Sequence, residues 1–260
     1  MKKNLCFLLT VIMLFSCFSI SAAANTYLPS GDAEIPYIPE TKDLSERIAD
    51  IYVSNKYTHT QKQLAVKKLE NKLRESNSIS INSANSSNYS YTLDVPYQEQ
   101  AEDYFCGPAT TRQTLLFFDV SNVPDQYDIA DDLYVTEDLG VPDAGYMIDY
   151  INSYIPDESP YAEEHPVDMD DMVLSFKVAC RSYGPPILRI KATSTSNWPY
   201  TTNAHYLNVS GAYKSGSYYS FQLTDPFIGW VTSTSTGKYT SSAEDVYDVV
   251  TTHWFGGYWW

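Results

Sequence analysis

Basic residues are scarce in the C-terminal two thirds of this 260-residue chain. Residues 89–260 contain 7 Lys and Arg against 24 Asp and Glu. Nucleic-acid binding depends on neutralising phosphates with Lys and Arg, so we expect no nucleic-acid partner. The basic residues gather instead in residues 56–75, which contain six Lys and Arg and two Glu. The two regions are either solvated surfaces of opposite charge or a basic segment that docks on an acidic domain.

Long hydrophobic runs are absent after the first 24 residues. Two lysines precede an apolar run over residues 5–20, and three alanines follow at 22–24. This pattern predicts a secretory signal peptide over residues 1–24 and a protein that is secreted or held at the surface of a bacterium. Residues 14–17 loosely resemble a lipoprotein processing site, which makes lipid anchoring at Cys17 the less favoured alternative. No later segment resembles a membrane span.

Cysteine and histidine are also few. Cleavage after Ala24 leaves only Cys106 and Cys180, which could form a disulfide in an exported protein. Cys180 shares a predicted helical face with Val173 and Phe176, which indicates a small buried side chain instead. His59, His165 and His253 show no paired ligand spacing, so no metal site is expected. No organic cofactor is expected either.

The chain is predicted to divide at a Ser/Asn-rich segment, residues 76–90. Before it lie two amphipathic helical patterns, marked by Leu44, Ile48, Ile51 and Tyr52 and by Ala65, Leu69 and Leu73. After it we expect helices over residues 107–118 and 168–183, a strand over 185–190 and a β-rich final third. Asp168 is placed to cap the second helix and Gly184 to end it. These elements predict an α+β domain over residues 91–260, preceded by a helical segment and linker over 25–90.

A hairpin is predicted over residues 205–226. A three-residue loop at 214–216 gives one apolar face and one polar face, with the pairs Leu207–Leu223 and Val209–Phe221 on the first and Tyr206–Thr224, Asn208–Gln222 and Ser210–Ser220 on the second. In this register His205 lies directly opposite Asp225, at a Cβ separation of roughly 4.5–5.5 Å. The two residues are either a functional pair or an ordinary strand-end histidine and the start of an Asp-Pro turn.

Cys106 stands at the predicted start of a helix, where the positive end of the helix dipole favours a thiolate. An imidazole beside it and a carboxylate on the other ring nitrogen are the groups that activate such a nucleophile. His205 and Asp225 can supply both. Gln100, six residues before Cys106, and the Cys106 backbone N–H can donate hydrogen bonds to an oxyanion.

From about Leu93 to the C-terminus the chain resembles the papain-like cysteine peptidases, specifically the bacteriocin-leader (double-glycine) processing peptidases and their secreted relatives. The motifs that carry the resemblance are VPYQEQ, Cys106-Gly107-Pro108-Ala109, Gly184-Pro185-Pro186, His205 with Gly211, and Asp225-Pro226. The resemblance implies a papain-like fold, in which the nucleophile helix packs on an antiparallel sheet. It implies that Cys106 is the nucleophile, His205 the base, Asp225 the residue that orients it and Gln100 the oxyanion donor, with a peptide or protein as substrate. It also implies that residues 25–90 contain an inhibitory prosegment, the alternative being a plain spacer.

Two other functions remain open from the sequence. One is a cell-wall peptidase or amidase that also uses Cys and His, which would bring cell-wall association. The other is a non-catalytic surface binding module on the same scaffold. The 23 tyrosines and the aromatic tail, HWFGGYWW, would suit carbohydrate or partner binding, although the tail is more simply interpreted as the closing strand of the core.

Overall fold

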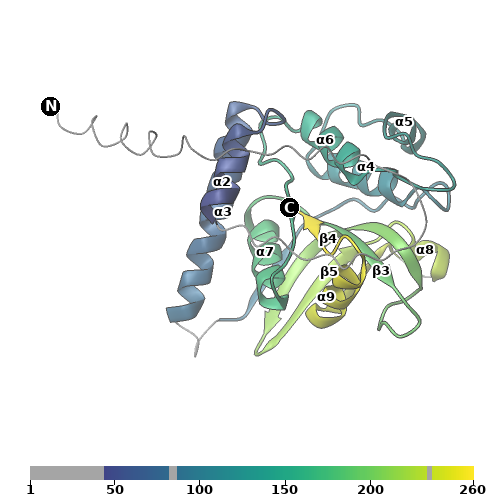
Figure 1. Ribbon diagram of the computed structural model, residues 1–260. Helices are drawn as coiled ribbons and strands as arrows, with labels where there is room; N and C mark the ends of the chain where they lie inside the picture. Colours follow the sequence, from purple (N-terminus) through teal and green to yellow (C-terminus); the bar gives the residue numbers. More distant parts are fainter. Residues whose placement is uncertain (1–43, 82–86, 233–235) are drawn as a thin grey trace, which may run out of the picture. The chain divides into compact units, whose positions relative to one another are not determined.

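The computed structural model describes residues 44–81, 87–232 and 236–260, all within the compact unit Ile35–Trp260 (Figure 1). The predicted signal peptide and Cys17 lie outside the described residues. Among the described helices, none combines the length and the apolar character that crossing a membrane requires.

An antiparallel sheet forms the centre of the described chain. Its strands follow the order β2-β7-β3-β4-β5-β6, and β1 pairs with β4 beyond the end of β3. The strands are β1 (Tyr89–Thr92), β2 (Glu163–Glu164), β3 (Ile187–Ala192), β4 (Thr202–Ser215), β5 (Tyr218–Thr224), β6 (Lys238–Ser242) and β7 (Tyr258–Trp259). The aromatic tail thus provides β7, which pairs with β2 and β3 and is buried. The interpretation of the tail as a closing strand is confirmed.

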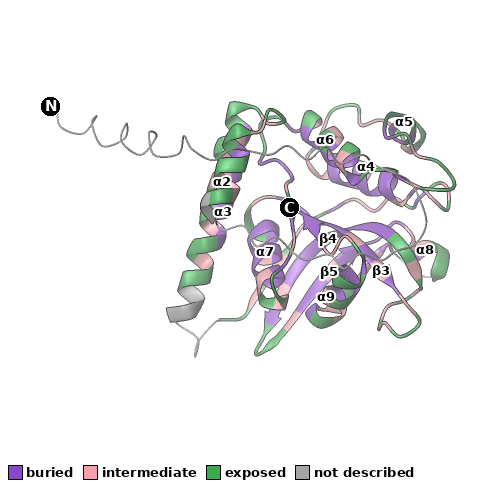
Figure 2. Ribbon diagram, viewed as in Figure 1, coloured by how far each residue is buried: buried purple, intermediate pink, exposed green. Residues whose placement is uncertain are grey.

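Helices cover both faces of the long central strand β4, which is buried without a break from His205 to Ala212 (Figure 2). The helices of this part are α4 (Cys106–Phe117), α5 (Gln126–Asp132), α6 (Ala144–Tyr154), α7 (Met169–Ser182), α8 (Ile228–Val231) and α9 (Ala243–Thr252). Leu207 and Val209 enter a core with α7 and α9, whereas Tyr206 enters a second core with α4, α5 and α6. The predicted α+β class is therefore confirmed, with the helix that begins at Cys106 packed on an antiparallel sheet.

The predicted hairpin register is wrong, although the hairpin itself is present. Ser215 pairs with Tyr218, so the loop has two residues, and Gly216 adopts the left-handed conformation (φ +61°) that such a loop requires. The register also shifts between Val209 and Gly211, which places Val209 opposite Leu223. Tyr206 and Asn208 of the predicted polar face lie against α4, which supplies polar partners.

A buried polar junction joins α4 to β4. Asn208 is fully buried, and its amide nitrogen donates to Gln113 Oε1 at 3.0 Å and to the Thr110 carbonyl at 3.3 Å. The Thr114 hydroxyl donates to Asn208 Oδ1 at 3.1 Å, and the Thr110 hydroxyl donates to the Tyr206 carbonyl at 3.0 Å. These bonds fix the helix that carries Cys106 relative to the strand that carries His205.

The N-terminal part forms α2 (Leu44–Val53) and α3 (His59–Ile81), which contains most of the basic segment, and these helices dock on the acidic body. Lys72 and Arg47 form ion pairs with the buried Glu164 of β2, and Lys72 also pairs with Asp171 at 2.7 Å. Further along α3, Glu75 pairs with two basic residues of α7. Opposite charges at this contact therefore favour the docking interpretation over two separate solvated surfaces.

The helix α3 extends six residues into the segment expected to be a linker, and residues 89–90 already belong to β1. The ion pairs of Glu75 hold this part of α3 on α7, which local Ser/Asn-rich composition could not indicate. Residues 82–86 lie outside the described residues, and the predicted domain boundaries stay a prediction.

Replacing Asn208 with Ala should destabilise the α4–β4 junction. The substitution leaves Gln113 Oε1 without its buried donor and removes the bond between the Thr114 hydroxyl and Asn208, which should lower the free energy of unfolding by about 1–3 kcal/mol. Urea denaturation measures this change. Asn203→Ala, on the exposed beginning of the same strand, is the matched control and should change stability by less than about 0.5 kcal/mol. Equal losses in the two variants would contradict the assignment.

Candidate active site

Cys106 is the first residue of α4 and is half-buried. Phe105 precedes the helix and makes no side-chain capping bond, so the first N–H groups of α4 are not occupied by a cap. Gly107 is needed here because a Cβ at this position would collide with the Val141 side chain. The sequence Cys-Gly-Pro thus places a thiol at a helix N-terminus against a tightly packed neighbouring loop.

His205 lies on β4 between Cys106 and Asp225. Its Nε2 is 2.9 Å from Asp225 Oδ1, and Cys106 is a hydrogen-bonding neighbour of the same imidazole. Because Nε2 is engaged with the carboxylate, Nδ1 is the ring nitrogen that serves the thiol. Asp225 is completely buried and His205 nearly so. The structure therefore brings together the three side chains predicted to form the triad.

Asp225 meets His205 through a turn rather than through strand pairing. Strand β5 ends at Thr224, and Asp225 follows it outside the β4–β5 ladder. The Asp225 N–H donates to the Gly237 carbonyl at 2.8 Å, while Asp225 Oδ1 accepts from the Phe227 N–H at 2.9 Å. These two bonds fold the chain so that the carboxylate points back at the imidazole.

The charges at the site favour a thiolate beside an imidazolium. Burial alone would raise the pKa of Cys106, but the hydrogen bond and charge of His205, with hydrogen bonds to the Tyr206 and Gly107 backbone, lower it below its ordinary value. Burial would lower the pKa of His205, yet Asp225 and Cys106 raise it to about 10. The pKa of Asp225, which burial would raise, is lowered by His205 and by its hydrogen bonds. Together these shifts favour the charged pair over a wide range around neutral pH.

Gln100 is buried beside this group, but its amide is already engaged. Its Nε2 donates to the carbonyls of Glu102 and Asp103 at 2.8 and 2.9 Å, and its Oε1 has no hydrogen-bond partner within the described residues. The Gln100 backbone N–H donates to the Pro226 carbonyl at 3.1 Å, next to Asp225. In the observed geometry Gln100 stabilises the loop before Cys106. To donate to an oxyanion, its amide would have to give up one of the two bonds to the Glu102 and Asp103 carbonyls.

Cys180 is a free thiol inside the core, as the helical pattern predicted, and Cys106 is also free. Burial raises the pKa of Cys180, which keeps this second thiol protonated. In the part of the chain that the structure describes, no group of three or more His, Cys, Asp or Glu side chains is arranged to hold a metal ion.

Sequence reasoning missed two tyrosines that contact Asp225. The hydroxyls of Tyr200 and Tyr239 donate to Asp225 Oδ2 at 2.6 and 2.9 Å. Tyr200 lies in the connection between β3 and β4 and Tyr239 lies on β6, so neither stands at a fixed spacing from the carboxylate. In a chain with 23 tyrosines, no local signal could have singled them out.

Comparison with known proteins supports a peptidase. The model of the Peptidase_C39-like family matches residues 92–252, which is more than half of the chain. The solved structure of digestive procathepsin L 3 from the larval midgut of Tenebrio molitor aligns with 85% of this chain and 99% of its own, with 10% identity and a TM-score of 0.39. None of the curated proteins compared with the chain matches it. The resemblance inferred from the motifs is confirmed: the chain belongs to the Peptidase_C39-like family and is a cysteine peptidase.

Proposed function

We propose that this protein is a secreted cysteine peptidase that hydrolyses peptide bonds through Cys106, His205 and Asp225. The observation that carries the proposal is the position of His205, which is a neighbour of both the Cys106 thiol and the buried Asp225 carboxylate. A carboxylate on one ring nitrogen fixes the orientation of the imidazole and stabilises its protonated form.

The first half of the proposed reaction acylates the enzyme. The Cys106 thiolate, whose proton is held by His205, attacks the carbonyl carbon of the scissile peptide bond, which forms a C–S bond and an oxyanion. When the intermediate collapses, the C–N bond breaks and the leaving amine takes the proton from His205. The products of this half are a thioester on Cys106 and a free amine.

The second half hydrolyses the thioester. His205 takes a proton from water, and the resulting hydroxide equivalent attacks the thioester carbon. Collapse breaks the C–S bond, releases the carboxylic acid product and restores the Cys106 thiolate beside the His205 imidazolium. Every proton is thus exchanged between substrate, water, Cys106 and His205.

The oxyanion of each intermediate requires hydrogen-bond donors. The backbone N–H of Cys106 at the start of α4 is suited to this position, since the positive end of the helix dipole adds to its effect. We propose Gln100 as the second donor, with one of its bonds to the Glu102 or Asp103 carbonyl exchanged for the oxyanion when substrate binds.

We further propose that residues 1–24 direct export as a signal peptide, which places the enzyme outside a bacterial cell or on its surface. The two lysines, the apolar run and the alanines at 22–24 support this location. Lipid anchoring at Cys17 is the less favoured form of the same proposal.

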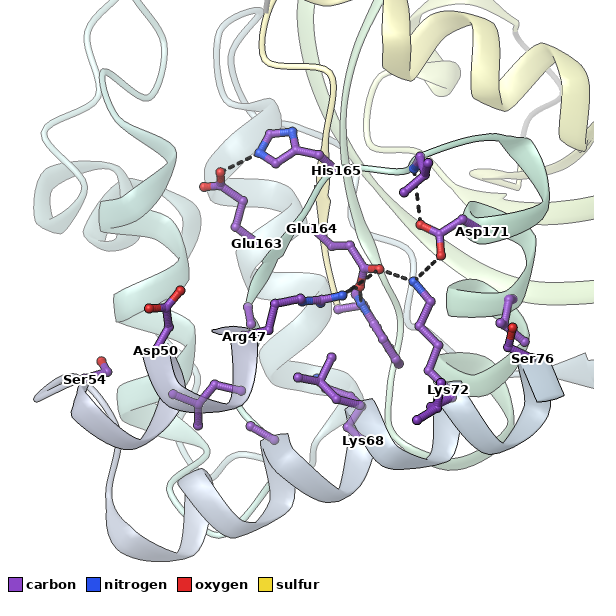
Figure 3. A pocket seen from close by; sticks show the side chains of 18 of the residues that line it. Arg47, Asp50, Ser54, Lys68, Lys72, Ser76, Glu163, Glu164, His165 and Asp171 are labelled. Atoms are coloured by element: carbon purple, nitrogen blue, oxygen red, sulfur yellow. Dashed lines mark hydrogen bonds and ion pairs between the residues drawn. The ribbon is translucent and has the colours of Figure 1, made fainter. Parts of the chain in front are cut away.

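The helices α2 and α3 are proposed to be a docked prosegment. The carboxylate of Glu164 accepts from Arg47, Lys72 and the Trp260 indole, and these groups line a cavity of about 630 Å³ (Figure 3). Lys68 is almost completely buried there, where its ammonium donates to the Pro160 carbonyl at 3.0 Å and lies over the Trp260 ring. Burial lowers the pKa of Lys68 to about 7.

The contacts of α2 and α3 give this prosegment a particular position. Gln61 donates to carbonyls at the end of α6, whereas Asn71 and Glu75 bind residues at the end of α7. The α2–α3 pair therefore contacts both the part of the domain that contains α6 and the part that contains α7. We propose that the excised prosegment stays bound through these contacts after the chain is cleaved on the C-terminal side of α3.

The central test of the function is the reactivity of Cys106. A thiol-directed epoxide should label wild-type protein stoichiometrically at Cys106, and the label should be lost in His205→Ala, as mapped by mass spectrometry. Peptide hydrolysis should be abolished in Cys106→Ala, assayed in parallel on protein substrates and on peptidoglycan fragments. Cleavage confined to peptidoglycan would favour the cell-wall alternative, and no labelling at all would favour a binding module.

The ionisation of the thiol should depend on His205. The rate of alkylation by iodoacetamide in wild-type protein should reach half its maximum below the usual thiol pKa of about 8.5. In His205→Ala the midpoint should rise above that value, because burial then acts without the opposing imidazolium. Buried Cys180 should stay unmodified in native protein and serves as the internal control. Identical midpoints in the two proteins would contradict the thiolate–imidazolium pair.

Processing should yield an N-terminus between residues 76 and 92 in active protein. If the bridging contacts hold, the excised fragment should co-elute with the domain in gel filtration and separate only in denaturant. Glu75→Gln removes the ion pairs with α7 and should promote dissociation, whereas Glu70→Gln, exposed on the same helix, is the matched control. Full activity in protein that begins at Asn25 would rule out a prosegment that must be removed.

A further inference from the structure

The carboxylate of Asp225 is held on both of its oxygens. Oδ1 accepts from His205 Nε2 and from the Phe227 N–H, both at 2.9 Å. Oδ2 accepts from the hydroxyls of Tyr200 and Tyr239 at 2.6 and 2.9 Å. Four donors thus surround a side chain that is completely buried.

The two tyrosines restrain a torsion that would otherwise be soft. The terminal torsion of an aspartate is broad and roughly two-fold, so the rotamer alone does not decide which oxygen faces the imidazole. Donors on Oδ2 from two separate segments, the β3–β4 connection and β6, limit that rotation. As a result Oδ1 stays directed at His205.

The ring of Tyr200 also covers the pair. It packs edge-on against His205, with centroids 5.6 Å apart and an interplanar angle of 85°, and against Phe227 at 5.0 Å. Trp198 lies behind both tyrosines, with its ring 5.9 Å from that of Tyr239 and 6.5 Å from that of Tyr200. This aromatic group keeps water from the His205–Asp225 bond, which strengthens the bond electrostatically.

We propose that Tyr200 and Tyr239 are positioning residues of the peptidase reaction, which act through Asp225 to hold His205 in the orientation that serves Cys106. The inference rests on the proposed function of the three triad side chains. It adds that the geometry of the triad depends on a pair of phenol donors on the outer carboxylate oxygen. Burial and the neighbouring carboxylate raise the pKa of both phenols, so each remains a protonated donor.

The test uses Tyr200→Phe, Tyr239→Phe and the double variant in the full-length protein. Each single change should lower kcat by roughly 10-fold to 100-fold with little change in KM, because it removes a hydrogen bond to a charged group that does not touch substrate. The apparent pKa of the Cys106 thiol, followed by iodoacetamide alkylation, should rise in each variant, since a less firmly held imidazolium stabilises the thiolate less.

Tyr161→Phe is the matched control. Tyr161 is buried, and its hydroxyl donates to the Pro185 carbonyl at 2.8 Å, so the substitution removes a comparable buried bond outside the triad. It should lower stability without moving the thiol pKa. If Tyr200→Phe and Tyr239→Phe lower stability like the control but leave the thiol pKa and kcat unchanged, both tyrosines are merely structural and the inference is wrong.

The alkylation measurement needs no substrate, which separates this inference from the proposed function. A wild-type protein without peptidase activity would defeat the function, yet a thiol pKa that still rises in the two variants would support the positioning of His205. A wild-type protein with full activity and unaffected variants would defeat only the inference.

Discussion

The hydrogen bond between His205 and the buried carboxylate of Asp225 is the interaction on which the candidate site depends. An isolated buried charge is strongly disfavoured, so the carboxylate is stable here only because it accepts from an imidazole, a backbone N–H and two phenols. Those donors come from β4, the turn after β5, the β3–β4 connection and β6. The same carboxylate therefore ties together the end of the sheet and sets the charge of the imidazole that faces Cys106.

Much of the fold could be predicted because it follows from local patterns. The helix that begins at Cys106 and the one capped by Asp168 were expected, and the Asp168 side chain does accept from the Asp171 N–H. The helix α9 was missed because its valines and threonines favour strands, whereas the Ser242 cap and the spacing of Val246, Val249 and Val250 decide for a helix. Docking on the sheet outweighs the local preference.

The residues of the candidate site could be predicted from the sequence, but their arrangement in space could not. His205 and Asp225 were paired through a hairpin register that is wrong, because neither the register shift near Gly211 nor the two-residue loop at Gly216 is visible in the apolar pattern. The side chains meet nonetheless, since the turn after Thr224 redirects Asp225. The Gln100 amide binds carbonyls only two and three residues further along, in a loop whose conformation the apolar pattern does not specify. The tyrosine donors come from distant segments, and no spacing along the chain identifies them.

The protonation state of His205 is the most direct measure of its pairing with Asp225 and Cys106. Nitrogen chemical shifts of this imidazole, measured by NMR across a pH series in wild-type protein and in Asp225→Asn, report both ring nitrogens separately. A charged His205–Asp225 pair predicts that both nitrogens carry protons at neutral pH in wild-type protein and that Nδ1 loses its proton only near the raised pKa of about 10. The pair also predicts that Asp225→Asn shifts this loss to lower pH. A neutral imidazole at pH 7 in wild-type protein, or a titration unaffected by Asp225→Asn, would contradict it.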